Sequence, residues 1–224
     1  MTEPHRHFHD ELAHVKERLL QMSGETQEAL DRSVRALLER DTDMADQVVA
    51  DDPKVDAHEM EIEEMVTSLL ALHQPMARDL RFLLAALKIS NDLERVGDHA
   101  VNIAQSAKRL LAYRPITPEP ELVEMGRRAR EMLASAIESF VRSDADAARA
   151  VCQEDDHVDA LHRSMFRILI THMAEDPHTI GAAMELFLVS RNLERVADLA
   201  TNVGEDVVFL VEGKSIKHGR AAGD

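Results

Sequence analysis

Two short acidic strings have the residue types and spacing that could bind a metal ion. Each has a glutamate, an aspartate four residues later and an asparagine four residues after that: Glu94, Asp98 and Asn102, and again Glu194, Asp198 and Asn202. In an α-helix, residues four apart lie on one face, about 6 Å from each other. Two carboxylates on adjacent turns can share a cation, and oxygen donors favour hard or borderline ions such as Mg²⁺, Ca²⁺, Mn²⁺ or iron.

An aspartate pair with the same spacing precedes each string. These pairs are Asp52 with Asp56 and Asp155 with Asp159. If the helix carrying each pair packs antiparallel beside the helix carrying the string, four carboxylates converge in each half of the chain. The alternative is that these aspartates stand at helix starts, where they bond to free N–H groups and complement the helix dipole.

A single Glu-x-x-x-Asp pair on an acidic helix is usually a solvated face, in which Arg95 and Arg195 would form ion pairs with the aspartates three residues on. The apolar stripe of the first string contains Leu93, Val96 and Ala100. At 100° per residue, the carboxylates lie roughly 130° from the centre of that stripe. They are therefore expected on a shoulder of the bundle that solvent reaches.

The strings belong to an internal repeat, which favours metal binding over a solvated face. Seven residues between Asp41 and Asp56 recur 103 positions later, and eight between Ser90 and Asn102 recur 100 positions later. Helical periodicity predicts elements over residues 8–37, 45–49, 53–73 and 76–113, then 122–141, a helix ending near 174, and 178–211. A capping residue is expected at Thr42 or Asp43, and a helix start at Pro53.

The predicted fold class is all-α, with two tandem three-helix bundles related by the internal repeat. The expected domains are a first bundle over residues 1–114, a linker over 115–120, a second bundle over 121–212 and a flexible tail over 213–224. Three antiparallel helices joined by short turns would make each bundle.

The composition excludes several classes of protein. The chain has 224 residues, 26 basic against 42 acidic side chains, and a formal charge of −16. With 8 glycines, 7 prolines and 3% aromatic residues, a β-sandwich or barrel is disfavoured. The acidic charge without a basic block argues against nucleic-acid binding. A single cysteine, Cys152, and the lack of a signal peptide or apolar span predict a cytoplasmic protein that does not insert into membrane.

The chain resembles the PhoU family. The resemblance rests on the duplicated Glu-Arg-x-x-Asp strings, the duplicated three-helix layout and a Gln-Pro-x-x-x-Asp-Leu-Arg turn that contains Gln74, Pro75 and Arg81. It extends from about Phe8 to Glu212. The second copy departs from the pattern at its turn, Asp176-Pro177, and by Ala197 in place of Gly97.

The resemblance implies a non-enzymatic cytoplasmic regulator of phosphate homeostasis. Such a protein couples a phosphate ABC transporter to a sensor histidine kinase, represses the phosphate-starvation response and restrains phosphate uptake. The implied partners are the transporter's ATPase subunit, the kinase and a second copy in a homodimer. The implied cofactor is a multinuclear metal cluster, iron first, with zinc, manganese, magnesium and calcium as alternatives. The metal-binding residues would be Glu94, Asp98, Glu194 and Asp198, with Asp52, Asp56, Asp155 and Asp159 as second pairs.

Two other hypotheses compete with this one. A di-metal carboxylate oxidoreductase would use Glu-x-x-His pairs, and Glu11 with His14 and Glu154 with His157 have that spacing. The two pairs do not correspond in the repeat. The other hypothesis is a metal-free helical scaffold whose acidic strings only keep the surface solvated.

Overall fold

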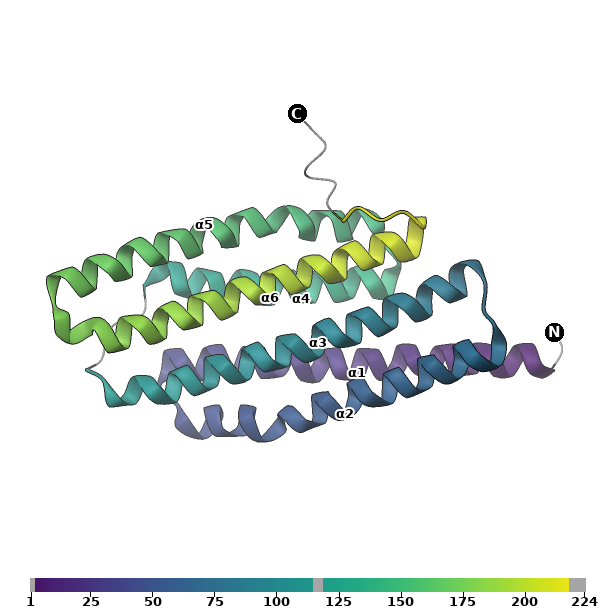
Figure 1. The fold of residues 1–224 in the computed structure, drawn as a ribbon, viewed down its shortest axis with the longest axis horizontal. Coiled ribbons are helices and arrows are strands. Elements are labelled where there is room, and N and C mark those ends of the chain that lie inside the picture. Colours follow the sequence, from purple (N-terminus) through teal and green to yellow (C-terminus); the bar gives the residue numbers. More distant parts are fainter. Residues whose placement is uncertain (1–2, 115–118, 218–224) are drawn as a thin grey trace, which may run out of the picture.

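A computed structural model describes residues 3–114 and 119–217, and six α-helices make up most of that part of the chain. They are α1 (Glu3–Glu39), α2 (Thr42–His73), α3 (Ala77–Arg109), α4 (Pro120–Arg142), α5 (Ala145–Glu175) and α6 (Ile180–Glu212), with short 3₁₀ turns at Leu110–Ala112 and Pro177–Thr179. Helices α1–α3 form one bundle and α4–α6 the other (Figure 1). The all-α, duplicated architecture is confirmed.

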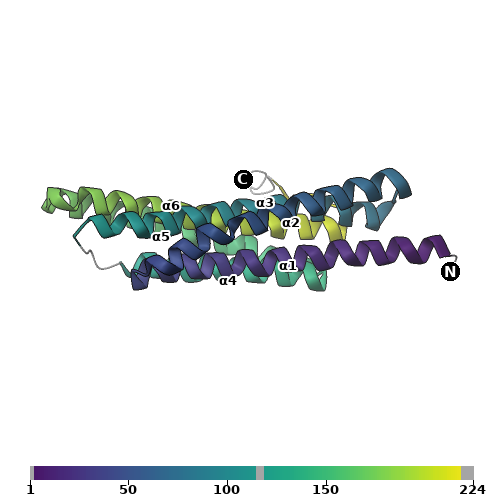
Figure 2. The ribbon, with the colours of Figure 1, turned by 90° about the horizontal axis from the view of Figure 1, so that it is seen from below.

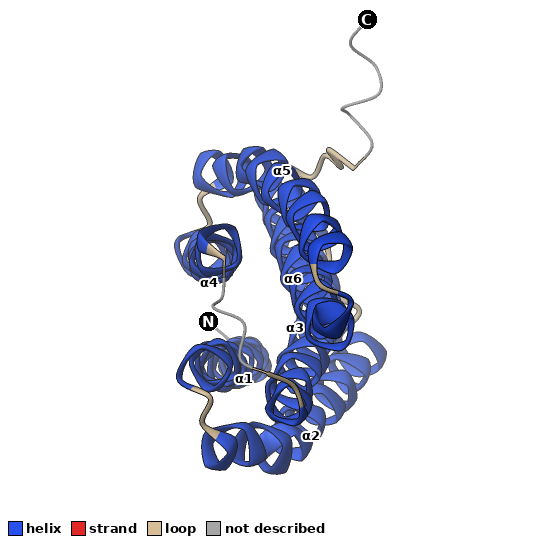
Figure 3. Cartoon of the chain, turned by 90° about the vertical axis from the view of Figure 1, so that its left-hand side faces the viewer, coloured by secondary structure: helices blue, strands red, loops and turns tan. Residues whose placement is uncertain are grey.

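The helices form two layers. Seen end-on, α1 and α4 lie on one side, and α2, α3, α6 and α5 follow one another on the other side (Figure 3). Seen from below, α1 and α4 are again separated from the layer that holds α3 and α6 (Figure 2). The two bundles therefore meet through α3 and α6, the third helix of each repeat.

Helices α3 and α6 run antiparallel. Arg81 Nε, near the start of α3, donates to the Leu210 carbonyl at 3.2 Å, and Arg109 Nε, at the end of α3, lies 2.9 Å from Glu185 Oε1. The first contact satisfies a free carbonyl at the carboxyl end of α6 and complements the helix dipole there. Arg81 of the predicted turn thus links the first repeat to the second by a hydrogen bond.

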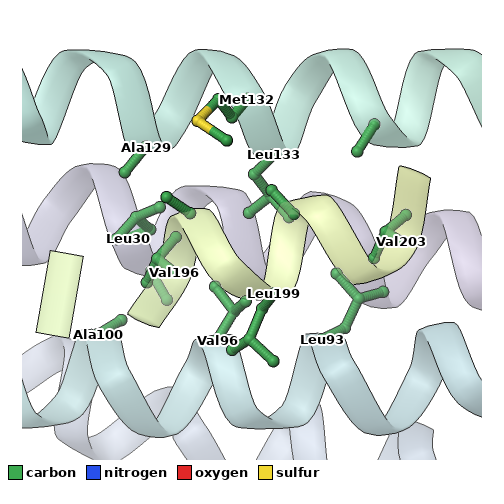
Figure 4. Close-up of a cluster of buried hydrophobic side chains, with 14 of the residues drawn as sticks. Leu30, Leu93, Val96, Ala100, Ala129, Met132, Leu133, Val196, Leu199 and Val203 are labelled. Carbon is green, nitrogen blue, oxygen red and sulfur yellow. The ribbon is translucent and has the colours of Figure 1, made fainter. Parts of the chain in front are cut away.

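One apolar core joins the two repeats (Figure 4). Leu93 and Val96 of α3 and Val196 of α6 are each at most 1% exposed. From the other layer, Leu30 of α1 and Leu133 of α4 are buried in the same core. The stripe that the sequence predicted on α3 is therefore buried, and it packs against the matching stripe of α6.

The structure corrects two local expectations. Helix α2 runs through Pro53 without a break. A proline removes one hydrogen bond from a helix interior, but the buried stripe that includes Val48, Val55 and Ile62 continues on both sides of it. The N-cap of α2 is Asp41, which accepts from Met44 N at 2.9 Å, and not Thr42 or Asp43.

The predicted linker and tail fall partly outside the described residues. Residues 115–118 of the linker and 218–224 of the tail are not described, and Pro120, expected in the linker, is the first residue of α4. Proline is well tolerated at that position, because the first N–H groups of a helix have no intrahelical acceptor.

Candidate functional site

The first acidic site lies where α2 and α3 pack side by side. Glu94 is half-buried and Asp98 exposed on α3, and Asp52 and Asp56 lie in the interior of α2 rather than at a helix start. The interpretation of this pair as helix caps is therefore wrong. The shoulder position expected for Glu94 and Asp98 agrees with their partial exposure.

The four carboxylates lie close enough for their charges to act on one another. Burial raises the pKa of Glu94, and the charges of Asp98, Asp56 and Asp52, together with Glu59, raise it further. Burial likewise raises the pKa of Asp52, with smaller contributions from Asp56 and Asp98. Like charges that raise one another's pKa favour any cation that enters between them.

The cations nearest this site are engaged elsewhere. Arg95 turns back to Asp92, with Nη1 3.5 Å from Oδ1, and Lys54 pairs with Asp51 at 2.7 Å. Within the described residues, none of the four carboxylates has an ion-pair or hydrogen-bond partner. The first site therefore carries unbalanced negative charge.

A glycine lets the two helices come close at this site. A Cβ added at Gly97 would lie 3.4 Å from Asp52 Oδ1 and 3.5 Å from Cγ1 of Val55. The Asp52 carboxylate therefore rests against the backbone of α3, one turn from Glu94. In the second repeat this position is Ala197, so a methyl group occupies the equivalent space.

The second acidic site has the same layout but is neutralised by arginines. Arg195 Nη1 lies 2.8 Å from Asp198 Oδ2, its Nε lies 3.5 Å from Glu194 Oε2, and Arg163 lies 3.7 Å from Asp159. Burial and Asp198 raise the pKa of Glu194, while Arg195 lowers it. The predicted arginine pairing is thus found at Asp198 and not at Asp98.

The donor sets fit a metal ion in chemical type and charge, and the first fits better than the second. As the side chains are placed, no three His, Cys, Asp or Glu side chains among residues 3–114 and 119–217 are grouped to hold one ion. Binding would require carboxylates to rotate toward one another at the first site, and would also require Arg195 to leave Asp198 at the second.

The Glu-x-x-His pairs do not form a di-metal site. Glu154 accepts from Arg128 Nη1 at 2.9 Å, and His157 beside it is exposed on α5. On α1, Glu11 pairs with His73 at 3.2 Å while His14 is exposed. The two pairs lie in different repeats with separate neighbours, so the oxidoreductase alternative is not supported.

A buried polar cluster at the contact of α3 with α6 escaped the sequence analysis. Asp206 is 1% exposed, and its Oδ1 lies 3.1 Å from Lys88 Nζ and 3.6 Å from Lys217 Nζ. Asp92 lines the same cavity, and burial raises its pKa to about 6. The repeat carries a signal for this cluster, because the residues equivalent to the buried Asp92 and Asp206 are the uncharged Asn192 and Ser106.

Comparisons with known proteins identify the family. The sequence model of the PhoU domain matches residues 19–107 and again residues 122–207. This chain belongs to the PhoU family. It is 36% identical to the phosphate-specific transport system accessory protein PhoU homolog of Zymomonas mobilis, over 93% of this chain and 88% of that protein. The homolog of the same name from Aquifex aeolicus is 38% identical, over 93% and 94% of the two chains.

Solved PhoU structures share the fold. The crystal structure of PhoU from Pseudomonas aeruginosa superposes with a TM-score of 0.89 and 35% identity, over 92% of this chain and all of that one. The phosphate transport system regulatory protein PhoU from Streptococcus pneumoniae gives a TM-score of 0.85 at 28% identity, over 93% and 98% of the two chains. The family's proteins are named as accessory and regulatory proteins of phosphate transport. No helix in the described part of this chain is long and apolar enough to span a membrane.

Proposed function

We propose that this protein is a cytoplasmic regulator that couples a phosphate ABC transporter to a sensor histidine kinase. It represses the phosphate-starvation response when phosphate is ample, restrains phosphate uptake and catalyses no reaction itself. The partners are the transporter's ATPase subunit, the kinase and a second copy in a homodimer. The observation that carries this proposal is the match of both repeats to the PhoU domain, together with relatives named for phosphate transport.

A reporter of the starvation response tests this role. In the organism that encodes this chain, deletion of its gene should activate the reporter in phosphate-rich medium, and the wild-type gene should restore repression. Co-purification from the same cells should recover the transporter's ATPase subunit or the kinase. A reporter that stays silent after deletion would overturn the regulatory role.

We also propose that the two acidic sites bind metal, in a multinuclear cluster at the first site. Iron is the first candidate, with zinc, manganese, magnesium and calcium as alternatives. The residues that would hold the metal are Glu94, Asp98, Asp52 and Asp56, and in the second repeat Glu194, Asp198, Asp155 and Asp159. The unbalanced charge of the first site supports this proposal. Elemental analysis of protein purified without chelator tests this proposal. Metal-free protein would mean that the acidic strings only keep the surface solvated.

A further inference from the structure

The second repeat exposes a cluster of large apolar side chains near the turn between α5 and α6. We define the distal patch as five residues whose exposed fractions run from 49% to 36%: Phe166, Ile170, Ile180, Met184 and Leu188. Phe166 and Ile170 are one turn apart on α5, and the other three follow at one-turn spacing on α6. The rings of Phe166 and Phe187 lie 5.6 Å apart and join the two helices.

The turn region extends the apolar surface. Tyr113, which is 38% exposed, lies against Gly181, where an added Cβ would clash with the tyrosine ring. A glycine beside Ile180 is therefore needed for this ring to rest on α6. The patch is thus continuous with an aromatic residue that the chain places there from the end of the first repeat.

The fold does not require three of these five apolar residues. With the repeat offsets, Phe166 and Ile170 correspond to Glu63 and Thr67 on α2, which are exposed at equivalent places in the first bundle. Leu188 corresponds to Lys88. Ile180 and Met184 correspond to Leu80 and Leu84, which are apolar in the first repeat as well. At the other three positions the first repeat builds the same helices with polar residues, so Phe166, Ile170 and Leu188 are not explained by folding.

The rim of the patch is basic on a strongly acidic protein. Arg163, Arg167 and Arg191 are exposed beside it, on the same two helices. Burial lowers the pKa of His162 most, the charge of Asp159 raises it, and the charges of Arg191 and Arg163 lower it. On a chain with a net charge of −16, these arginines are the groups that would attract an acidic partner, although Arg163 lies 3.7 Å from Asp159.

We propose that the distal patch is a docking surface for an acidic amphipathic helix of a partner protein. Exposed apolar side chains at one-turn spacing on two neighbouring helices match the anchors that a helix presents every three to four residues. Acidic residues flanking those anchors would meet Arg167 and Arg191. This inference rests on the proposed adaptor role and adds to it the place where a partner binds.

An anionic membrane also combines apolar groups with negative charge, but it fits the distal patch less well than an acidic helix does. The unbalanced carboxylates of Glu94, Asp98 and Asp56 on the first repeat would be repelled by anionic headgroups. A protein helix contacts only the patch and its rim, so it avoids this repulsion.

Photo-crosslinking in living cells tests the proposal. A benzophenone amino acid is placed at Ile170 and, as a control, at Leu72, an apolar residue of α2 that is 75% exposed. We expect Ile170 to capture a partner peptide that is acidic and has apolar residues at helical spacing, and Leu72 not to capture it. The synthetic peptide of that sequence should then bind the purified protein.

The variant F166E/R167E provides the specificity control. It places in the second repeat the two glutamates that the first repeat carries at Glu63 and Glu64, so the helices should form normally. We expect peptide binding to weaken about tenfold or more. The matched variant M60E, at an exposed methionine of α2, should bind like the wild type.

Several outcomes would overturn the proposal. These are no capture at Ile170, capture of a basic segment or of a second copy of this chain, or sedimentation of the protein with phosphatidylglycerol vesicles that F166E/R167E abolishes. If the gene deletion activates the phosphate reporter in any of these cases, the regulatory role stands and only the docking surface is wrong.

Discussion

Arg195 Nη1 lies 2.8 Å from Asp198 Oδ2, so an arginine occupies the place where the second repeat would receive a cation. In the first repeat, the matching Arg95 turns to Asp92 and leaves Asp98 without a cation. The two acidic sites thus share a sequence pattern but differ in charge balance. A metal ion must compete with a guanidinium at one site and not at the other.

The first prediction concerns the residues that hold metal. In the variant E94A/D98A, we expect about half of the bound metal to be lost, and this half should be the more tightly bound one, because the first site has no competing arginine. Helical content should stay unchanged, since neither side chain is in the core. Elemental analysis and circular dichroism measure the two quantities. Wild-type stoichiometry in the variant would refute the assignment.

The second prediction concerns the competing arginine. Arg195→Ala should remove the positive charge that pairs with Asp198 and Glu194. Metal affinity at the second site should then increase, because the two carboxylates lose their competing cation. Arg95→Ala is the matched control, because Arg95 pairs outside the acidic site. Titration calorimetry with Mn²⁺ compares them. Equal affinities in the two variants would mean that Arg195 does not control the site.

Helical periodicity was sufficient to predict the architecture but not the state of the acidic sites. The stripe that includes Leu93 and Val96 depends only on spacing within one helix, so it could be predicted. Where Arg95 points depends on Asp92, which is buried against the other repeat. The burial of Asp92 results from the packing of α3 against α6, and the residue pattern of a single helix carries no information about that packing.

Local signals also failed where tertiary packing outweighs them. Pro53 suggested a helix start, but α2 continues because its buried residues pack on both sides of the proline. A cap role for Asp52 therefore stayed open beside the metal-binding one, although Asp52 lies in a helix interior facing Gly97. The repeat predicted that Asp52 pairs with Asp56, but only the structure shows that both couple to Glu94.

The third prediction is a pH dependence of stability. Burial raises the pKa of Asp92 from 3.8 to about 6. Between those values the folded protein binds more protons than the unfolded chain, so the free energy of unfolding falls as the pH rises. Asp92→Asn, which introduces the amide found at Asn192, removes this loss. It should stabilise the protein by about 1–3 kcal/mol at neutral pH and not below about pH 4.

Urea unfolding of chelator-treated protein at pH 4 and pH 7.5 measures this effect. Glu63→Gln, at an exposed carboxylate of α2, is the control and should change neither value by more than about 0.5 kcal/mol. A gain for Asp92→Asn that is equal at both pH values would show that the protonation of Asp92 is not its cause.

The fourth prediction concerns the close approach of α5 and α6. A Cβ at Gly204 would lie 2.9 Å from the carbonyl oxygen of Ala148 and 3.2 Å from Sγ of Cys152. Gly204→Ala should therefore push the helices apart and lower the free energy of unfolding by about 1–3 kcal/mol. Gly24, in α1, has no atom within 4 Å of an added Cβ, so Gly24→Ala should raise it by about 0.5–1 kcal/mol through helix propensity. Urea unfolding distinguishes them, and an equal gain in both variants would show that the helices are not tightly packed at Gly204.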